Sequence, residues 1–149
     1  MTLSGGGIVG IYNNATGTLK IKNCINMANI DISNTILNYP NTYAGGIIAC
    51  ITNGNVIIEN CINTGDIVYP LEDLYLTASG ILGGNFIVNV SNVSITECIN
   101  AGHIQGNVAG GIIGGVDGIC IIEDCMNIGN IESINITDIP SMILPSAVW

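Results

Sequence analysis

Apolar and polar residues alternate along this chain over short stretches, and no stretch sustains the apolar spacing of a helix. One segment shows the pattern most clearly. Residues 46–50 form an apolar run, residues 56–61 alternate, and residues 66–68 form a third short run. Asn53-Gly54 and Thr64-Gly65 lie between these runs, and such pairs are typical of turns. The segment therefore predicts three short β-strands joined at two corners.

The same pattern occurs four times along the chain. Each copy begins with two small residues followed by two apolar ones, and each later contains Cys-Ile-Asn or Cys-Met-Asn. The pairs are Gly6-Gly7, Gly45-Gly46, Ser79-Gly80 and Gly110-Gly111, and the cysteines are Cys24, Cys61, Cys98 and Cys125. Successive cysteines are 37, 37 and 27 residues apart, a spacing typical of stacked repeats. We therefore predict an all-β fold, a right-handed parallel β-helix (solenoid) of about four three-strand coils.

These repeats also predict the domain organisation. The repeats span residues 4–32, 43–68, 77–105 and 108–132, so that residues 1–132 form one four-repeat β-helix. Residues 33–42 and 69–76 are inserted between repeats and are predicted to project as loops. Residues 133–149 are predicted to form a C-terminal cap or the start of a further coil, because stacked repeats with bare ends expose apolar surface.

The second strand of each repeat shows which side chains face the interior. The residues five and three positions before each cysteine are apolar in all four copies. The residues between them are Lys20, Ile57, Ser94 and Ile121, a mixed set. Because side chains alternate along a strand, the apolar positions are predicted to point inward and the mixed position outward.

The four cysteines occupy one position of the repeat, so a parallel stack places them in a column with about 4.8 Å between neighbours. They are interpreted as small hydrophobic residues facing a dry interior, with disulfides as the alternative. The asparagines two residues later, Asn26, Asn63, Asn100 and Asn127, are predicted to form a structural ladder of side-chain amides, in preference to a ligand site. Two residues further on stand Ala28, Gly65, Gly102 and Gly129, where a positive φ or a tight corner favours glycine.

The chain is strongly acidic. It has 11 Asp and Glu residues against Lys20 and Lys22, and its formal net charge is −9. Binding to nucleic acid is not expected, because neutralising phosphates requires clustered Lys and Arg. No stretch resembles a membrane helix, so this segment is not expected to insert into a membrane, and its first residues lack the features of a signal peptide.

The four glycine motifs, such as Gly-Gly-Ile-Val-Gly at residues 6–10, together with the Cys-Ile-Asn motifs that follow them, resemble GLUG-type repeats over residues 4–132. Ala49 and Ala28 depart locally from the pattern. Such repeats occur in large surface or secreted bacterial proteins, including adhesin-like proteins and some IgA-cleaving metallopeptidases, where they form non-catalytic β-helical stalks. The resemblance implies a structural or adhesive segment of a larger protein at the cell surface or outside the cell, and it carries over no catalytic residue.

The sequence predicts no catalytic activity, no cofactor and no bound metal. His103 is the only histidine, so a His-Glu-x-x-His zinc motif is missing, and a cysteine facing the core cannot act with it on a substrate. The alternative function is a carbohydrate-binding or carbohydrate-degrading β-helix. The carboxylates that would serve it are Glu59, Asp66, Glu97, Glu123 and Asp124.

Tyrosines suggest where a partner would bind. Tyr39, Tyr43, Tyr69 and Tyr75 lie in or beside the two inserted loops. Amphipathic tyrosines on projecting loops suit recognition of a protein or glycan on a host or neighbouring cell surface. The alternative is that these loops fold back and cover the core.

Overall fold

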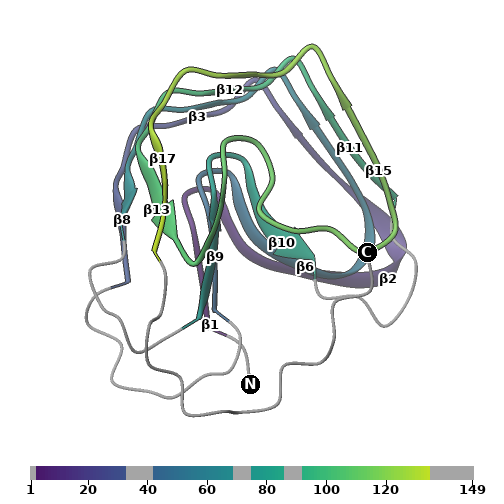
Figure 1. Cartoon of the computed structure of the whole chain (residues 1–149). Helices are drawn as coiled ribbons and strands as arrows, with labels where there is room; N and C mark the ends of the chain where they lie inside the picture. Colours follow the sequence, from purple (N-terminus) through teal and green to yellow (C-terminus); the bar gives the residue numbers. More distant parts are fainter. Residues whose placement is uncertain (1–2, 33–41, 69–74, 86–91, 135–149) are drawn as a thin grey trace.

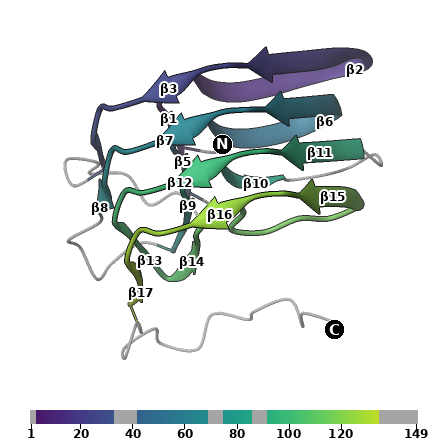
Figure 2. The same ribbon diagram turned by 90° about the horizontal axis from the view of Figure 1, so that it is seen from above.

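A computed structural model describes residues 3–32, 42–68, 75–85 and 92–134, which form strands and turns and no helix. Viewed along its long axis, the chain winds repeatedly around one path, so that equivalent strands overlie one another (Figure 1). In the view turned by 90°, the windings lie in layers (Figure 2). We number these windings coils 1 to 4 in chain order.

Each coil contains several short strands. Coil 1 comprises β1 (Leu3–Gly6), β2 (Val9–Lys22), β3 (Ile25–Asn26) and β4 (Ile30–Asp31). Coil 2 comprises β5 (Thr42–Gly45), β6 (Ile48–Glu59), β7 (Ile62–Asn63) and β8 (Ile67–Val68). Coil 3 comprises β9 (Leu76–Ser79), β10 (Leu82–Asn85), β11 (Asn92–Thr96), β12 (Ile99–Asn100) and β13 (Ile104–Gly106). Coil 4 comprises β14 (Val108–Gly110), β15 (Ile119–Glu123), β16 (Met126–Asn127) and β17 (Ile131–Ser133).

Equivalent strands of successive coils pair in parallel and build four sheets, which we name A to D. Sheet A contains β1, β5, β9 and β14; sheet B contains β2, β6, β10, β11 and β15; sheet C contains β3, β7, β12 and β16; and sheet D contains β4, β8, β13 and β17. The strand register is that of the sequence repeat, since Asn63 pairs with Asn26 on one side and with Asn100 on the other. The predicted parallel β-helix is therefore confirmed.

The described coils contribute strands to four sheets, whereas the sequence analysis predicted three strands per coil. Two of the predicted strands, residues 46–50 and 56–61, lie largely within the single bent strand β6 of sheet B. The sheets that were not predicted are A, whose strands end at the first residue of each glycine pair, and C, whose strands directly follow the cysteines. Thr42 begins β5 and Leu76 begins β9, so both predicted loops end one residue too late. The predicted corner at Asn53-Gly54 is a bend inside β6, where Gly54 has a φ of 96° and strand pairing resumes after it.

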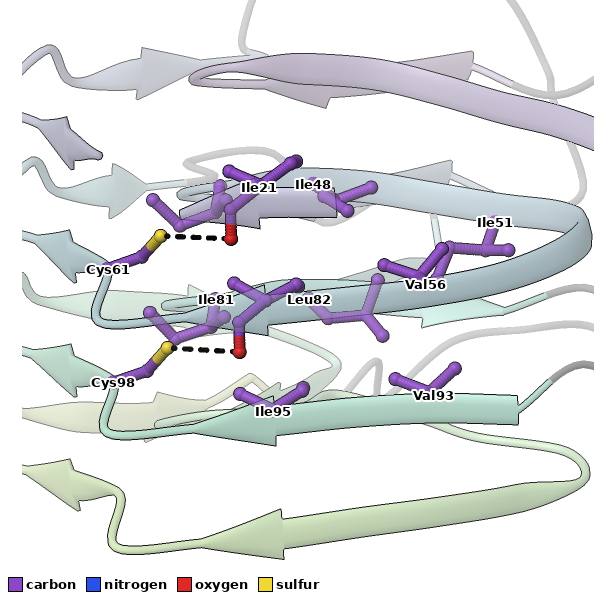
Figure 3. Packing of buried hydrophobic residues seen from close by; sticks show 12 residues of the cluster. Ile21, Ile48, Ile51, Val56, Cys61, Ile81, Leu82, Val93, Ile95 and Cys98 are labelled. Atoms are coloured by element: carbon purple, nitrogen blue, oxygen red, sulfur yellow. Dashed lines mark hydrogen bonds between the residues drawn. The ribbon is translucent and has the colours of Figure 1, made fainter. Parts of the chain in front are cut away.

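Sheet A lies between sheets B and D and divides the interior into two cores (Figure 1). The smaller core packs sheet A against sheet D and includes Ile67, Leu76 and Ile104. The larger core fills the curve of sheet B and includes Ile48 and Ile95 (Figure 3). Burying one such aliphatic side chain stabilises a fold by about 1.5–3 kcal/mol. The β-branched residues of the alternating pattern therefore supply both strand propensity and core.

Burial of the inward positions depends on the neighbouring coils. Ile58 and Ile95, in coils 2 and 3, are fully buried, whereas Ile122 at the same position of coil 4 is 43% exposed. No described coil follows coil 4, whereas Ile21 of coil 1, which coil 2 follows, is buried. Its inward side chains therefore form an apolar end face.

Candidate functional site

Asparagine side chains form a continuous ladder along sheet C. The Nδ2 of Asn26 donates to Oδ1 of Asn63 at 2.8 Å, that of Asn63 to Asn100 at 2.8 Å, and that of Asn100 to Asn127 at 2.7 Å. Each Nδ2 also donates to the backbone carbonyl two residues later, which for Asn63 is Gly65 at 2.8 Å. Asn63 and Asn100 are fully buried. Both N–H groups of these two amides are thus used inside the fold, which makes the ladder a structural element.

The second glycine of each opening pair packs flat against this ladder. A Cβ at Gly46 would lie 2.3 Å from Cγ of Asn63, and one at Gly80 would lie 2.2 Å from Cγ of Asn100. Carbon atoms that are not bonded pack at about 3.5–4.0 Å. The glycine motif and the Cys-Ile-Asn motif therefore belong to one packing unit, in which glycine leaves room for the amide.

The cysteines line the larger core beside this ladder. Cys61 and Cys98 are fully buried, and all six cysteines of the chain are free thiols. The thiols of Cys61 and Cys98 donate to the carbonyl oxygens of Ile21 and Ile58, one coil earlier, at 3.7 and 3.8 Å (Figure 3). The pKa of Cys98 is raised, first by the thiol contact with Cys61 and then by burial. A buried thiol with a raised pKa is a poor nucleophile, so Cys98 is not suited to attack a substrate. The same contact lowers the pKa of Cys61 to about 6, but the side chain of Cys61 is fully buried.

A column of residues with positive φ stands directly before the cysteines and was missed by the sequence analysis. Its members, Asn23, Asn60, Glu97 and Asp124, have φ values between 52° and 56°. Asparagine and aspartate tolerate this left-handed conformation better than other non-glycine residues. The polar residue before every cysteine was the signal that could have revealed it. For Gly65, Gly102 and Gly129 the sequence analysis offered a positive φ or a tight corner. Their φ angles are not positive, and the structure shows a tight corner.

The carboxylates considered for a carbohydrate site are Glu59, Asp66, Glu97, Glu123 and Asp124, and they do not all gather at one place. Glu97 and Asp124 are neighbours in the positive-φ column, with Glu123 directly before Asp124. Glu59 forms an ion pair with Lys22 of the neighbouring coil. Thr96 stands between Glu59 and Glu123 in sheet B, so these two residues are two strands, or roughly 9.6 Å, apart. Asp66 lies at a different corner, between sheets C and D. Within the described residues, no group of three or more His, Cys, Asp or Glu side chains is placed to hold a metal ion.

The corner between sheets C and D carries its own hydrogen-bonded column. Oδ1 of Asn29 accepts from the backbone N–H of Asp66 at 2.9 Å, and Oδ1 of Asp66 accepts from that of His103 at 2.8 Å. Nε2 of His103 lies 3.5 Å from Oε2 of Glu132. A depression of about 260 Å³ beside this column is lined by Asn29, Ile30, Asp31, Asp66 and Val68. His103 therefore belongs to a structural corner, away from the Cys98 thiol in the core.

The structure places two of the four tyrosines predicted to bind a partner. Tyr39 and Tyr69 lie outside the described residues. Tyr43 is half-buried in β5, where a Cβ at Gly84 would come within 2.7 Å of its ring, and burial raises the pKa of Tyr43. Tyr75 is 41% exposed, and its carbonyl oxygen accepts from the N–H of Thr42 at 3.3 Å. Both tyrosines thus lie where the neighbouring strands β5 and β9 of sheet A begin, with Tyr43 packed and Tyr75 accessible.

An outward-facing apolar row on sheet C was also missed by the sequence analysis. Ile25, Ile62, Ile99 and Met126 lie side by side in register. Ile25 is 56% exposed, Met126 is 49% exposed, and the two central isoleucines are half-buried. Each stands between an inward cysteine and an inward asparagine, so strand alternation could have placed it on the outer face. We call these four residues the sheet C ridge.

No family model, curated protein or solved structure matches this chain. The described part of the chain contains no helix that could span a membrane.

Proposed function

We propose that this chain is a non-catalytic structural and adhesive segment of a larger surface-associated or secreted protein, of the kind that GLUG-type repeats form. The observation that supports this most directly is the sheet C ridge, an apolar row that crosses all four coils on the outer face. Contiguous apolar surface of this kind is typical of sites where proteins associate.

The interior supports the role of a spacer. The buried amides of Asn63 and Asn100 are hydrogen-bonded within the stack, and the thiols of coils 2 and 3 donate to backbone carbonyls. Each coil contacts chiefly its neighbours, as in other repeat proteins, so rigidity along the axis comes from the repeated coil-to-coil hydrogen bonds. A partner would therefore bind to the outer surface.

The ridge favours a protein partner over a glycan. Isoleucine and methionine pack against apolar protein surface, whereas sugars are held by directed polar groups and aromatic faces. Tyr75, directly before β9, is an accessible aromatic residue among the described ones, and it would serve the glycan-binding alternative. The two kinds of partner thus depend on different residues of this chain.

Binding of the purified chain to immobilised extracellular-matrix proteins and to a glycan panel tests this function. Ile99→Ser should weaken binding to a matrix protein, because it places a hydroxyl in the middle of the ridge. Ile57→Ser is the matched control, since Ile57 is an outward, half-buried isoleucine on sheet B. Equal binding by wild type and Ile99→Ser, or binding to none of the proteins, would contradict adhesion through the ridge. Glycan binding lost in Tyr75→Ala, or cleavage of a polysaccharide, would favour the carbohydrate alternative.

A further inference from the structure

The corner two residues after each ladder asparagine has no room for a side chain inside the stack. A Cβ at Gly65 would lie 2.1 Å from the carbonyl oxygen of Ala28, one at Gly102 would lie 2.1 Å from that of Gly65, and one at Gly129 would lie 2.0 Å from that of Gly102. A carbon atom and a carbonyl oxygen approach each other to about 3.3 Å in proteins. In all three cases the obstructing oxygen belongs to the preceding coil. A methyl group fits at this corner only where no coil of the same geometry lies on that side.

Ala28 is the one member of this column with a methyl group, and it stands in coil 1. The residue is exposed. By the geometry of Gly65 and Gly102, its methyl group points out of the stack along the axis. It therefore occupies the position where the corner carbonyl of a preceding coil would lie.

In other respects the two ends of the stack are complementary. Each ladder amide donates its Nδ2 proton to the Oδ1 of the following coil, so a second copy placed before coil 1 would present Asn127 Nδ2 to Asn26 Oδ1. Lys22 and Glu123 occupy the same strand position, so Glu123 of that copy would lie beside Lys22, as Glu59 does on the other side. The described residues of coil 1 and coil 4 therefore offer the hydrogen bonds and charges of an ordinary coil-to-coil contact.

We propose that Ala28 is a steric stop that prevents copies of this chain from stacking head to tail through coil 4 of one and coil 1 of the next. Such a contact joins different surfaces of the two copies and does not close, so it would propagate into filaments. Exposed strand edges are a general route to such association, and native proteins block them with local features. The stop is independent of the function proposed for the ridge, which lies on the side of the solenoid.

Sedimentation velocity of Ala28→Gly over a wide range of protein concentration tests the proposal. Removing the clash should raise the association constant at least about tenfold, and the species formed should grow without a limiting size. Ala101→Gly is the matched control, because Ala101 is an exposed alanine next to the same corner in coil 3, and it should behave as the wild type. Circular dichroism checks that each variant is folded.

A second substitution identifies the surfaces involved. Lys22→Glu, added to Ala28→Gly, should reduce association because it places like charge opposite Glu123 of the next copy. Equal mass distributions for wild type and Ala28→Gly would overturn the proposal. Association of Ala28→Gly that Lys22→Glu leaves unchanged would also overturn it, since the copies would then meet through another surface.

Discussion

Replacing Asn63 by alanine should reveal how much the asparagine ladder stabilises the solenoid. Asn63 is fully buried in the middle of the stack, and its side chain takes part in the three hydrogen bonds of the ladder. It accepts from Asn26, and it donates to Asn100 and to the carbonyl of Gly65, all at 2.8 Å. Alanine removes all three and leaves the Oδ1 of Asn100 and the Gly65 oxygen without these donors.

The expected loss follows from the number of bonds and from the groups left unpaired. A hydrogen bond contributes about 1 kcal/mol net, and a buried group left unsatisfied costs about 1–3 kcal/mol. Asn63→Ala should therefore lower the free energy of unfolding by about 3–5 kcal/mol. For a chain of this length that is a fall in Tm of roughly 6–20 °C. It is a large part of the roughly 5–15 kcal/mol that separates a folded domain from its unfolded state.

Urea denaturation followed by circular dichroism measures this loss, with Asn127→Ala as the matched variant. Asn127 is exposed in coil 4, accepts from Asn100 at 2.7 Å and donates to the carbonyl of Gly129 at 2.9 Å. Water can replace these bonds, so the expected loss is only about 1 kcal/mol. Equal losses in the two variants, or a loss below about 1 kcal/mol for Asn63→Ala, would refute the view that the ladder stabilises the stack by burial of paired amides.

The remaining predictions concern packing and the thiols. Gly65→Ala should lower the free energy of unfolding by about 2 kcal/mol or more, because its methyl group would meet the Ala28 oxygen, and a urea midpoint equal to that of wild type would contradict the close approach. A thiol-reactive label should modify half-buried Cys24 before buried Cys61 in the native protein, and peptide mapping that finds the reverse order would show that the column is accessible. The free energy of unfolding should fall as the pH rises above about 9. The raised pKa of Cys98 keeps its thiol protonated in the folded chain, whereas the same thiol ionises in the unfolded chain, so a rising pH favours unfolding. Urea midpoints measured across this range should show the fall, and Cys98→Ala should reduce its slope.

The fold class follows from the sequence because the evidence for it is periodic and local. Alternation identified the strands, and four motifs in register predicted parallel stacking. Strand alternation also places Ile99 of the sheet C ridge on the outer face. The sequence analysis used alternation only for the second strand of each repeat, so it missed the two-residue strands of sheet C. Sheet A was missed because Thr42 and the residues after it carry no clear alternating pattern and become a strand only by pairing with β9.

The candidate sites were predicted less completely. The asparagines and cysteines were recognised as columns from their spacing. The positive φ at Glu97 could not be inferred from residue preference, since glutamate rarely adopts it, and the bend between β11 and β12 imposes it. Tyr43 was grouped with the accessible tyrosines, although its ring packs against the backbone at Gly84.

The repeat, its register and the inward direction of Ile58, Ile95 and Ile122 can be read from the chain alone, because side chains alternate along any strand and the motif recurs in phase. Other properties arise only when coils separated by tens of residues come together. Ile95 is buried because coil 4 follows it in the stack, whereas Ile122 is exposed because no described coil follows coil 4. Gly65 must be glycine because the Ala28 carbonyl of the coil before it lies 2.1 Å from where its Cβ would be. Such contacts depend on the stacking of whole coils, and a local pattern of apolar and polar residues does not contain them.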